Sequence, residues 1–263
     1  MSELTTRLRE ILAGLAASDP RHKRFGAAQH RYELAPPLDE RALASIMEQA
    51  GFTGELPADY LEYVTRLSAG GVGPYYGLIS ADRARAIAAP PGVTAWQHAL
   101  PIAHLGCGYA ALLILDGPAS GQIWLDARPL AILAPIRPSF TAFYLDWIDR
   151  VAHNQWLDGF VPPGQCAITA ALTGYFGVVE QRLGIDSGTL AGPALRSALE
   201  DLGPDAIEVT ADRPLPLFDE GDRLDPCATC ARALQGLADQ GLRGDVVATG
   251  LPPKPQRTVT PPS

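Results

Sequence analysis

The stretch that decides the fold runs from Leu56 to Trp147 and contains, in order, Leu56-Pro57-Ala58-Asp59-Tyr60, Gly70-Gly71-Val72-Gly73-Pro74-Tyr75-Tyr76-Gly77-Leu78, Gly121-Gln122-Ile123-Trp124-Leu125-Asp126 and Tyr144-Leu145-Asp146-Trp147. Proline is well tolerated in the first turn of a helix, so the first segment predicts a helix start. The glycine pair in the second segment predicts the end of that helix. The aromatic residues are widely spaced and include no catalytic set, which is typical of a scaffold that presents a recognition face.

Strands are predicted after the glycine pair, where short runs end at glycine, proline or aspartate: residues 75–80, 111–115, 122–126 and 130–133. The segment Gly117-Pro118-Ala119-Ser120-Gly121 predicts a hairpin turn. Helices are predicted near the N-terminus by apolar spacing, after a capping Asp39, and from Pro138 through Val151. The pattern therefore predicts an α+β fold with a mostly antiparallel sheet.

A change of composition at Val161-Pro162-Pro163-Gly164 predicts a linker. Beyond it, the apolar pattern predicts three helices and two short strands. We therefore expect four parts: an N-terminal helix and basic turn at residues 1–37, a main domain at 38–160, a smaller C-terminal α/β segment containing a C-x-x-C motif at 165–250, and a disordered tail at 251–263.

The order of these features in residues 38–150 resembles the SUKH superfamily of Smi/Knr-type proteins, which is widespread among bacterial toxin-immunity proteins. The resemblance rests on the Leu-Pro-x-x-Tyr helix, the Gly-Pro-Tyr-Tyr-Gly-Leu turn, the strand runs and the Phe-x-x-x-Tyr-x-x-Trp helix. It implies a curved antiparallel sheet flanked by helices. It also implies a non-enzymatic immunity protein that neutralises a cognate toxin by occluding its active site.

Charge supports a protein partner rather than a nucleic acid. The formal net charge is −8, and residues 1–33 hold six basic against four acidic groups, so the acidity lies in the remainder. Such a surface repels phosphates and attracts basic proteins, including a basic toxin. The alternative is that the acidity only keeps the protein soluble. We expect the partner to contact the glycine-rich turn, the hairpin and nearby acids, namely Gly73, Pro74, Tyr75, Tyr76, Asp82, Asp116 and Asp126.

The cysteines are Cys107, Cys166, Cys227 and Cys230, too few and too scattered for a disulfide framework. Only Cys227 and Cys230 have informative spacing, and the Pro-Cys-x-x-Cys motif resembles the zinc-binding half of the nucleotide deaminase fold. Zinc is the cofactor that this pair would hold; a structural site needs two further ligands, for which Cys166 and His153 are the best candidates. Packed thiols in a helix are the alternative.

Two further functions stay open: a zinc-dependent deaminase-like enzyme or its decayed relative, and a SUKH-type regulatory adaptor. Deaminases also need a glutamate two residues after a histidine or cysteine ligand, and no histidine or cysteine of this chain has one. We therefore expect no catalytic residues. The absence of a long apolar run and of a secretory signal pattern leads us to expect a cytoplasmic protein without a membrane contact.

Overall fold

The computed structural model describes residues 3–49, 52–153, 155, 166–203, 207–210, 223–244 and 246–249. The chain divides into two compact units, Met1–Val161 and Pro162–Ser263. This division falls within the linker predicted from sequence. The first 37 residues, which the sequence sets apart, belong to the first unit. The tail predicted at 251–263 lies outside the described residues.

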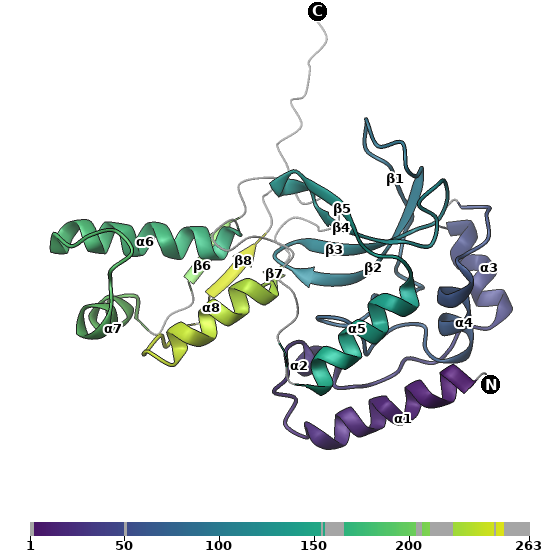
Figure 1. Ribbon diagram of the computed structural model, residues 1–263, viewed down its shortest axis with the longest axis horizontal. Coiled ribbons are helices and arrows are strands. Elements are labelled where there is room, and N and C mark those ends of the chain that lie inside the picture. The colour runs from purple at the N-terminus through teal and green to yellow at the C-terminus, as the bar shows by residue number, and fades with distance from the viewer. Residues whose placement is uncertain are drawn as a thin grey trace, which may run out of the picture. The chain divides into compact units, whose positions relative to one another are not determined.

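The first unit is built on an open antiparallel sheet of five strands in the order β1-β2-β3-β4-β5 (Figure 1). Its central strand β3 (Tyr109–Ile114) is buried at every residue. Helices flank the sheet, so the predicted α+β class with an antiparallel sheet is confirmed. The remaining strands are β1 (Ile87–Ala88), β2 (His98–Gly106), β4 (Ile123–Ala127) and β5 (Ile132–Arg137).

The strand predicted at residues 75–80 is wrong. This segment forms a turn in which Tyr75 has φ +58° and Gly77 has φ +105°. Within it, the β-bridges are isolated ones from Leu78 to Gly71 and Ala103, and the Ile79 N–H donates to the Ile102 carbonyl oxygen at 2.8 Å. Left-handed backbone angles interrupt the regular hydrogen-bond ladder that a strand requires, so its aromatic composition does not produce one.

The helices of the first unit begin where local capping chemistry places them. The backbone N–H of Ala42 donates to Asp39 Oδ1 at 2.7 Å, which confirms the predicted cap. The last helix begins at Phe140 rather than Pro138, because Ser139 Oγ accepts from the Ala142 N–H at 3.1 Å. The helices are α1 (Glu3–Ser18), α2 (Ala27–His30), α3 (Glu40–Gln49), α4 (Ala58–Arg66) and α5 (Phe140–Ala152), with a short 3-10 turn, η1 (Arg128–Leu130).

Aromatic side chains of α4 and α5 form the centre of the core. Tyr63 contacts both Phe140 and Tyr144, with ring centroids 4.9 and 5.0 Å apart, and Tyr144 contacts Trp147 at 5.2 Å. Tyr144 and Trp147 are each 1% exposed, which agrees with the core role predicted for them. Burial raises the pKa of Tyr63 and of Tyr144 above their usual range. These phenols therefore stay neutral as part of the scaffold.

His30, at the end of α2, makes this core sensitive to acid. Its pKa is lowered to about 4, mainly by burial and in addition by the charge of His22, whereas Asp19 acts in the opposite direction. Its Nδ1 accepts a hydrogen bond from the Tyr32 N–H at 3.0 Å, and its ring packs edge-on against Trp147. Protonation at Nδ1 would remove that acceptor and bury a charge.

We expect the free energy of unfolding to fall as pH drops from 6.5 towards about 4. In this range His30 is protonated in the unfolded chain but stays neutral in the folded protein. The loss reaches at most about 3 kcal/mol. Urea denaturation at pH 7, 5.5 and 4.5 measures it, and His30→Gln should flatten this part of the profile. Identical pH profiles for the two proteins would contradict the assignment.

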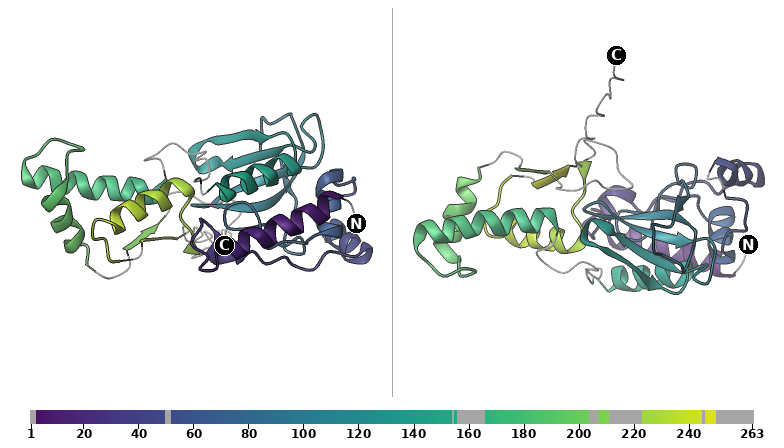
Figure 2. Two further views of the ribbon diagram at one scale, coloured as in Figure 1. Left: turned by 60° about the horizontal axis from the view of Figure 1, so that its bottom comes forward. Right: turned by 90° about the horizontal axis from the view of Figure 1, so that it is seen from above.

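The second unit contains a three-stranded sheet in the order β6-β8-β7. Strand β6 (Ile207–Thr210) pairs parallel with β8 (Val246–Thr249), and β7 (Arg223–Leu224) pairs antiparallel with it. Helix α6 (Ala167–Leu183) packs against this sheet and against α8 (Ala228–Ala238), and both views of Figure 2 show the two helices side by side. Helix α7 (Gly192–Asp201) follows α6.

Candidate functional site

The structure buries most of the glycine-rich turn that the sequence assigned to partner contact. Gly73, Pro74 and Tyr75 are buried, and only Tyr76 is half-exposed. A Cβ atom on Gly26 would lie 1.6 Å from the carbonyl oxygen of Tyr75, so the turn lies directly against that glycine. The turn therefore builds the core, and Gly73, Pro74 and Tyr75 offer no contact surface in this fold.

The three predicted acids have different roles. Asp126 is 3% exposed and forms a bidentate ion pair with Arg128, at 2.8 and 2.7 Å. Its carboxylate is already satisfied within the chain, so its assignment to the partner surface is corrected. Asp82 is exposed and accepts a hydrogen bond from Ser80 Oγ. Asp116 is half-buried at the hairpin and organises the loops around it.

Asp116 joins the β3–β4 hairpin to the loop before β2. Its Oδ1 accepts from the backbone N–H groups of Gln97 and His98 at 2.7 and 2.9 Å, and its Oδ2 lies 2.5 Å from His98 Nδ1. Burial alone would raise the pKa of Asp116, but the hydrogen bonds from His98 and the two N–H groups outweigh it, so the pKa is lowered. The carboxylate therefore stays charged and holds the two loops together at neutral pH.

Close backbone packing strengthens the same junction. The Ala119 N–H donates to the Ala95 carbonyl oxygen at 3.1 Å. Gly117 has φ +73°, and a Cβ atom there would lie 2.7 Å from that same oxygen. A third loop adjoins them: Phe52 packs against His98 with ring centroids 5.9 Å apart, and a Cβ on Gly121 would lie 3.9 Å from Pro57 Cβ.

We call these three segments, residues 52–57, 90–98 and 116–121, the rim. They contain Glu55 and Asp116 but no lysine or arginine, so the rim is acidic apart from the paired His98. The hairpin was predicted from its glycines and proline, whereas the other two segments carry no sequence signal that joins them to it. Its exposed residues are Thr53, Gly54, Glu55, Pro91, Gly92, Thr94, Gln97, Gly117, Pro118 and Ser120.

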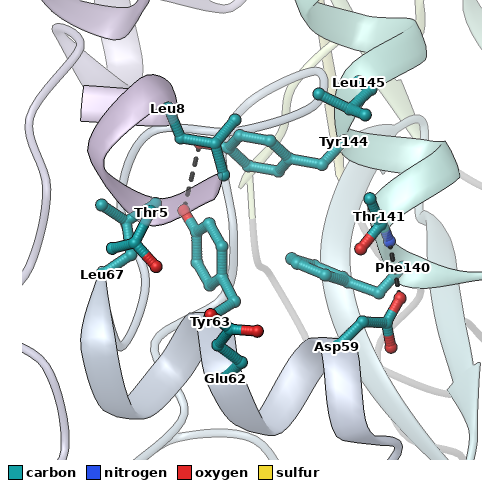
Figure 3. Close-up of a pocket in the computed structure, with 10 residues that line it drawn as sticks. All are labelled: Thr5, Leu8, Asp59, Glu62, Tyr63, Leu67, Phe140, Thr141, Tyr144 and Leu145. Carbon is teal, nitrogen blue, oxygen red and sulfur yellow. Dashed lines mark hydrogen bonds between the residues drawn. The ribbon is translucent and has the colours of Figure 1, made fainter. Parts of the chain in front are cut away.

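A pocket among α1, α4 and α5 is too small for a metabolite (Figure 3). Its cavity volume is about 20 Å³, which accommodates about one water molecule. The Tyr63 hydroxyl donates to the Tyr144 hydroxyl at 3.1 Å, and the latter donates to the Val72 carbonyl at 2.9 Å. Asp59 Oδ2 accepts from the Thr141 N–H at 2.8 Å, which links the starts of α4 and α5. These contacts are structural.

The second unit brings three cysteines together. The sulfur atoms of Cys166, Cys227 and Cys230 lie within 4.8 Å of one another, and all three residues are buried. Cys166, one of the two further ligands considered from sequence, thus joins the predicted pair. His153, the other, belongs to the first unit. Its side chain is 64% exposed, and its Nδ1 lies 2.8 Å from the Asp149 carbonyl oxygen. Cys107 is buried at the β2–β3 turn of the first unit.

Comparison with family models, with curated proteins and with solved structures finds no match to this chain. Among the described residues, no helix has both the length and the apolar character needed to cross a membrane.

Proposed function

We propose that this chain is a non-enzymatic immunity protein of the cytoplasm, which binds a cognate bacterial toxin and occludes its active site. The rim of the first unit is the contact surface in this proposal. The observation that carries it is the combination of exposed residues and fixed geometry in three loops at one end of an antiparallel sheet. The resemblance of residues 38–150 to SUKH proteins supports the same function.

Rigidity makes the rim suitable for recognition. A loop that is already ordered loses little conformational entropy on binding, so more of the contact energy appears as affinity. Asp116 and the Ala119–Ala95 hydrogen bond supply that order before any partner arrives. A standard interface buries about 800 Å² on each partner, so we expect the contact to include adjoining surface as well as the rim.

Charge indicates a basic partner. Residues 1–161 contain 13 basic and 16 acidic groups, and the remainder contains 8 and 13, so both units are acidic. The rim itself has no lysine or arginine, and the Nδ1 atom of its histidine, His98, lies against Asp116. Nuclease toxins are basic because they bind phosphates, so one of them would be attracted to this surface.

Co-expression with the protein encoded by the neighbouring gene is expected to rescue cells from its toxicity, and the purified proteins should bind. The association rate should fall as salt is added, while dissociation changes little, because charge acts mainly on the encounter. Glu55→Lys, on the rim, should slow association by roughly two- to tenfold. Stopped-flow kinetics at two salt concentrations measure both effects.

Asp149→Lys is the matched control, because this substitution makes the same change of charge outside the rim. The Asp149 side chain lies on α5 and is 71% exposed. It should alter association less than Glu55→Lys does. Failure to rescue cells would refute the immunity function. Equal effects of the two reversals would instead remove the rim from the interface while leaving the function in place.

The three cysteines favour one alternative, a zinc-dependent deaminase-like enzyme. Such enzymes use a glutamate two residues after the first ligand to move protons. In this chain that position after Cys166 is Ile168, which is fully buried. We therefore expect no turnover of cytidine, adenosine or guanine derivatives with added zinc, and turnover abolished by Cys227→Ala would establish the enzyme instead.

A further inference from the structure

We propose that Cys166, Cys227 and Cys230 bind one zinc ion through their thiolates, and that this ion holds the second unit together. The site is independent of toxin binding. It rests on three buried sulfur atoms that come from two helices and meet within 4.8 Å.

Helix starts position all three ligands. Cys166 is the N-cap residue of α6 and Cys227 is the N-cap residue of α8, both with extended backbone angles. Cys230 lies in the first turn of α8, so its side chain shares a face with that of Cys227. Because α6 packs against α8, a residue 61 positions earlier in the chain completes the set.

The distances suit a metal better than a disulfide. Zinc–sulfur bonds of about 2.3 Å at tetrahedral angles place ligand sulfur atoms roughly 3.8 Å apart. Cys166 Sγ and Cys227 Sγ lie 3.2 Å apart, and every pair of the three lies within 4.8 Å. A disulfide requires a separation of about 2.05 Å. Small side-chain rotations would bring the three sulfur atoms onto a zinc ion.

The local electrostatics favour thiolates. The positive ends of two helix dipoles, α6 and α8, point at the cluster, which stabilises negative sulfur ligands. Buried anions need a cation, and thiolate donors in tetrahedral geometry select zinc over magnesium or calcium. Binding releases the thiol protons, so occupancy should increase with pH.

The ion has a structural role in this arrangement. Ile168 stands where a proton-transferring glutamate would be needed, so the site lacks the base that deaminases use. The sheet of the second unit consists of strands of four, two and four residues, a small framework for a compact unit. A metal ion bound at the starts of α6 and α8 would link these two helices directly, whereas the short strands do not connect them.

Metal analysis of the full chain purified under reducing conditions tests the proposal. We expect about one zinc per chain, lost in Cys166→Ser, Cys227→Ser and Cys230→Ser. Ala228→Ser is the matched control, because it adds a hydroxyl at a buried neighbour and keeps every thiol. It should retain zinc, and chelation should lower the melting temperature of wild type and control but not of the cysteine variants.

Cobalt substitution keeps the test decisive if a cysteine variant does not fold. Wild-type chain loaded with Co²⁺ should show the strong near-ultraviolet charge-transfer bands of thiolate ligands and the visible bands of a tetrahedral ion. A zinc-free wild type that also gives no such bands on cobalt addition would overturn the proposal. A Cys166–Cys227 disulfide, found by peptide mass analysis of the protein purified under reducing conditions, would overturn it as well.

Discussion

Gly26→Ala is expected to destabilise the protein by about 4 kcal/mol or more, a large part of the stability of an ordinary domain. Gly26 has φ +76°, where an L-residue is strained, and its Cβ would lie 1.6 Å from the Tyr75 carbonyl oxygen. The atoms that this Cβ would meet are backbone atoms of Tyr75 and Tyr76, so relief requires the glycine-rich turn to move away from α2. Urea denaturation followed by circular dichroism measures the loss.

Alanine substitutions at two other glycines distinguish the cost of backbone strain from the cost of a steric clash. Gly92 has φ +90° but open space around it, so Gly92→Ala should cost only the strain, about 1 kcal/mol. Gly14 lies within α1 with nothing near its Cβ position, so alanine there should stabilise by up to about 1 kcal/mol. If Gly26→Ala costs no more than Gly92→Ala, the close approach of the turn is wrong.

Trp147→Ala should cost about 3–5 kcal/mol, because a large buried ring is lost and the surrounding core cannot close the cavity. The side chain is 1% exposed and packs against Tyr144 and His30, with ring centroids 5.2 and 5.8 Å away. Equilibrium unfolding of the full chain in urea gives the value.

Leu145→Ala is the control on the same helix, since Leu145 is 40% exposed and should cost clearly less. Trp147→Phe provides a second comparison, because the indole nitrogen has no hydrogen-bond partner among the described residues. Trp147→Phe should therefore lower the free energy of unfolding by only part of the amount that Trp147→Ala does. Equal losses in Trp147→Ala and Leu145→Ala would contradict the placement of Trp147 at the core centre.

Strand β2 shows why one central element was missed in the sequence. Its segment contains Pro101, and proline argues against a strand because it cannot donate a ladder hydrogen bond. In the structure the register shifts between Pro101 and Ala103, so an irregularity in the ladder accommodates the proline. The pairing with β3 stabilises the strand despite its proline, and this tertiary contact leaves no signal in the local sequence.

The same limit applies to the rim and the cysteines. The hairpin at 116–121 has its own glycine and proline signature, but its junction with Gln97 and His98 depends on side-chain hydrogen bonds across 19 and 18 residues. The sequence places Asp126 near the partner surface as one of the acids that would attract a basic partner, and its buried ion pair with Arg128 reverses that expectation. The sequence offers both Cys166 and His153 as further ligands beside Cys227 and Cys230, and only the structure shows that Cys166 joins them.

The sequence by itself determined the features that depend on neighbours a few residues apart: the cap at Asp39, the start of α4 after Pro57, the hairpin turn at Gly117 and the helical face that buries Tyr144 and Trp147. Hydrogen bonds, backbone angles and periodicity of this kind depend only on residues that are close together in the sequence. Only the tertiary structure decided which glycines, acids and thiols face one another, because those contacts arise when distant segments compete for the same buried space.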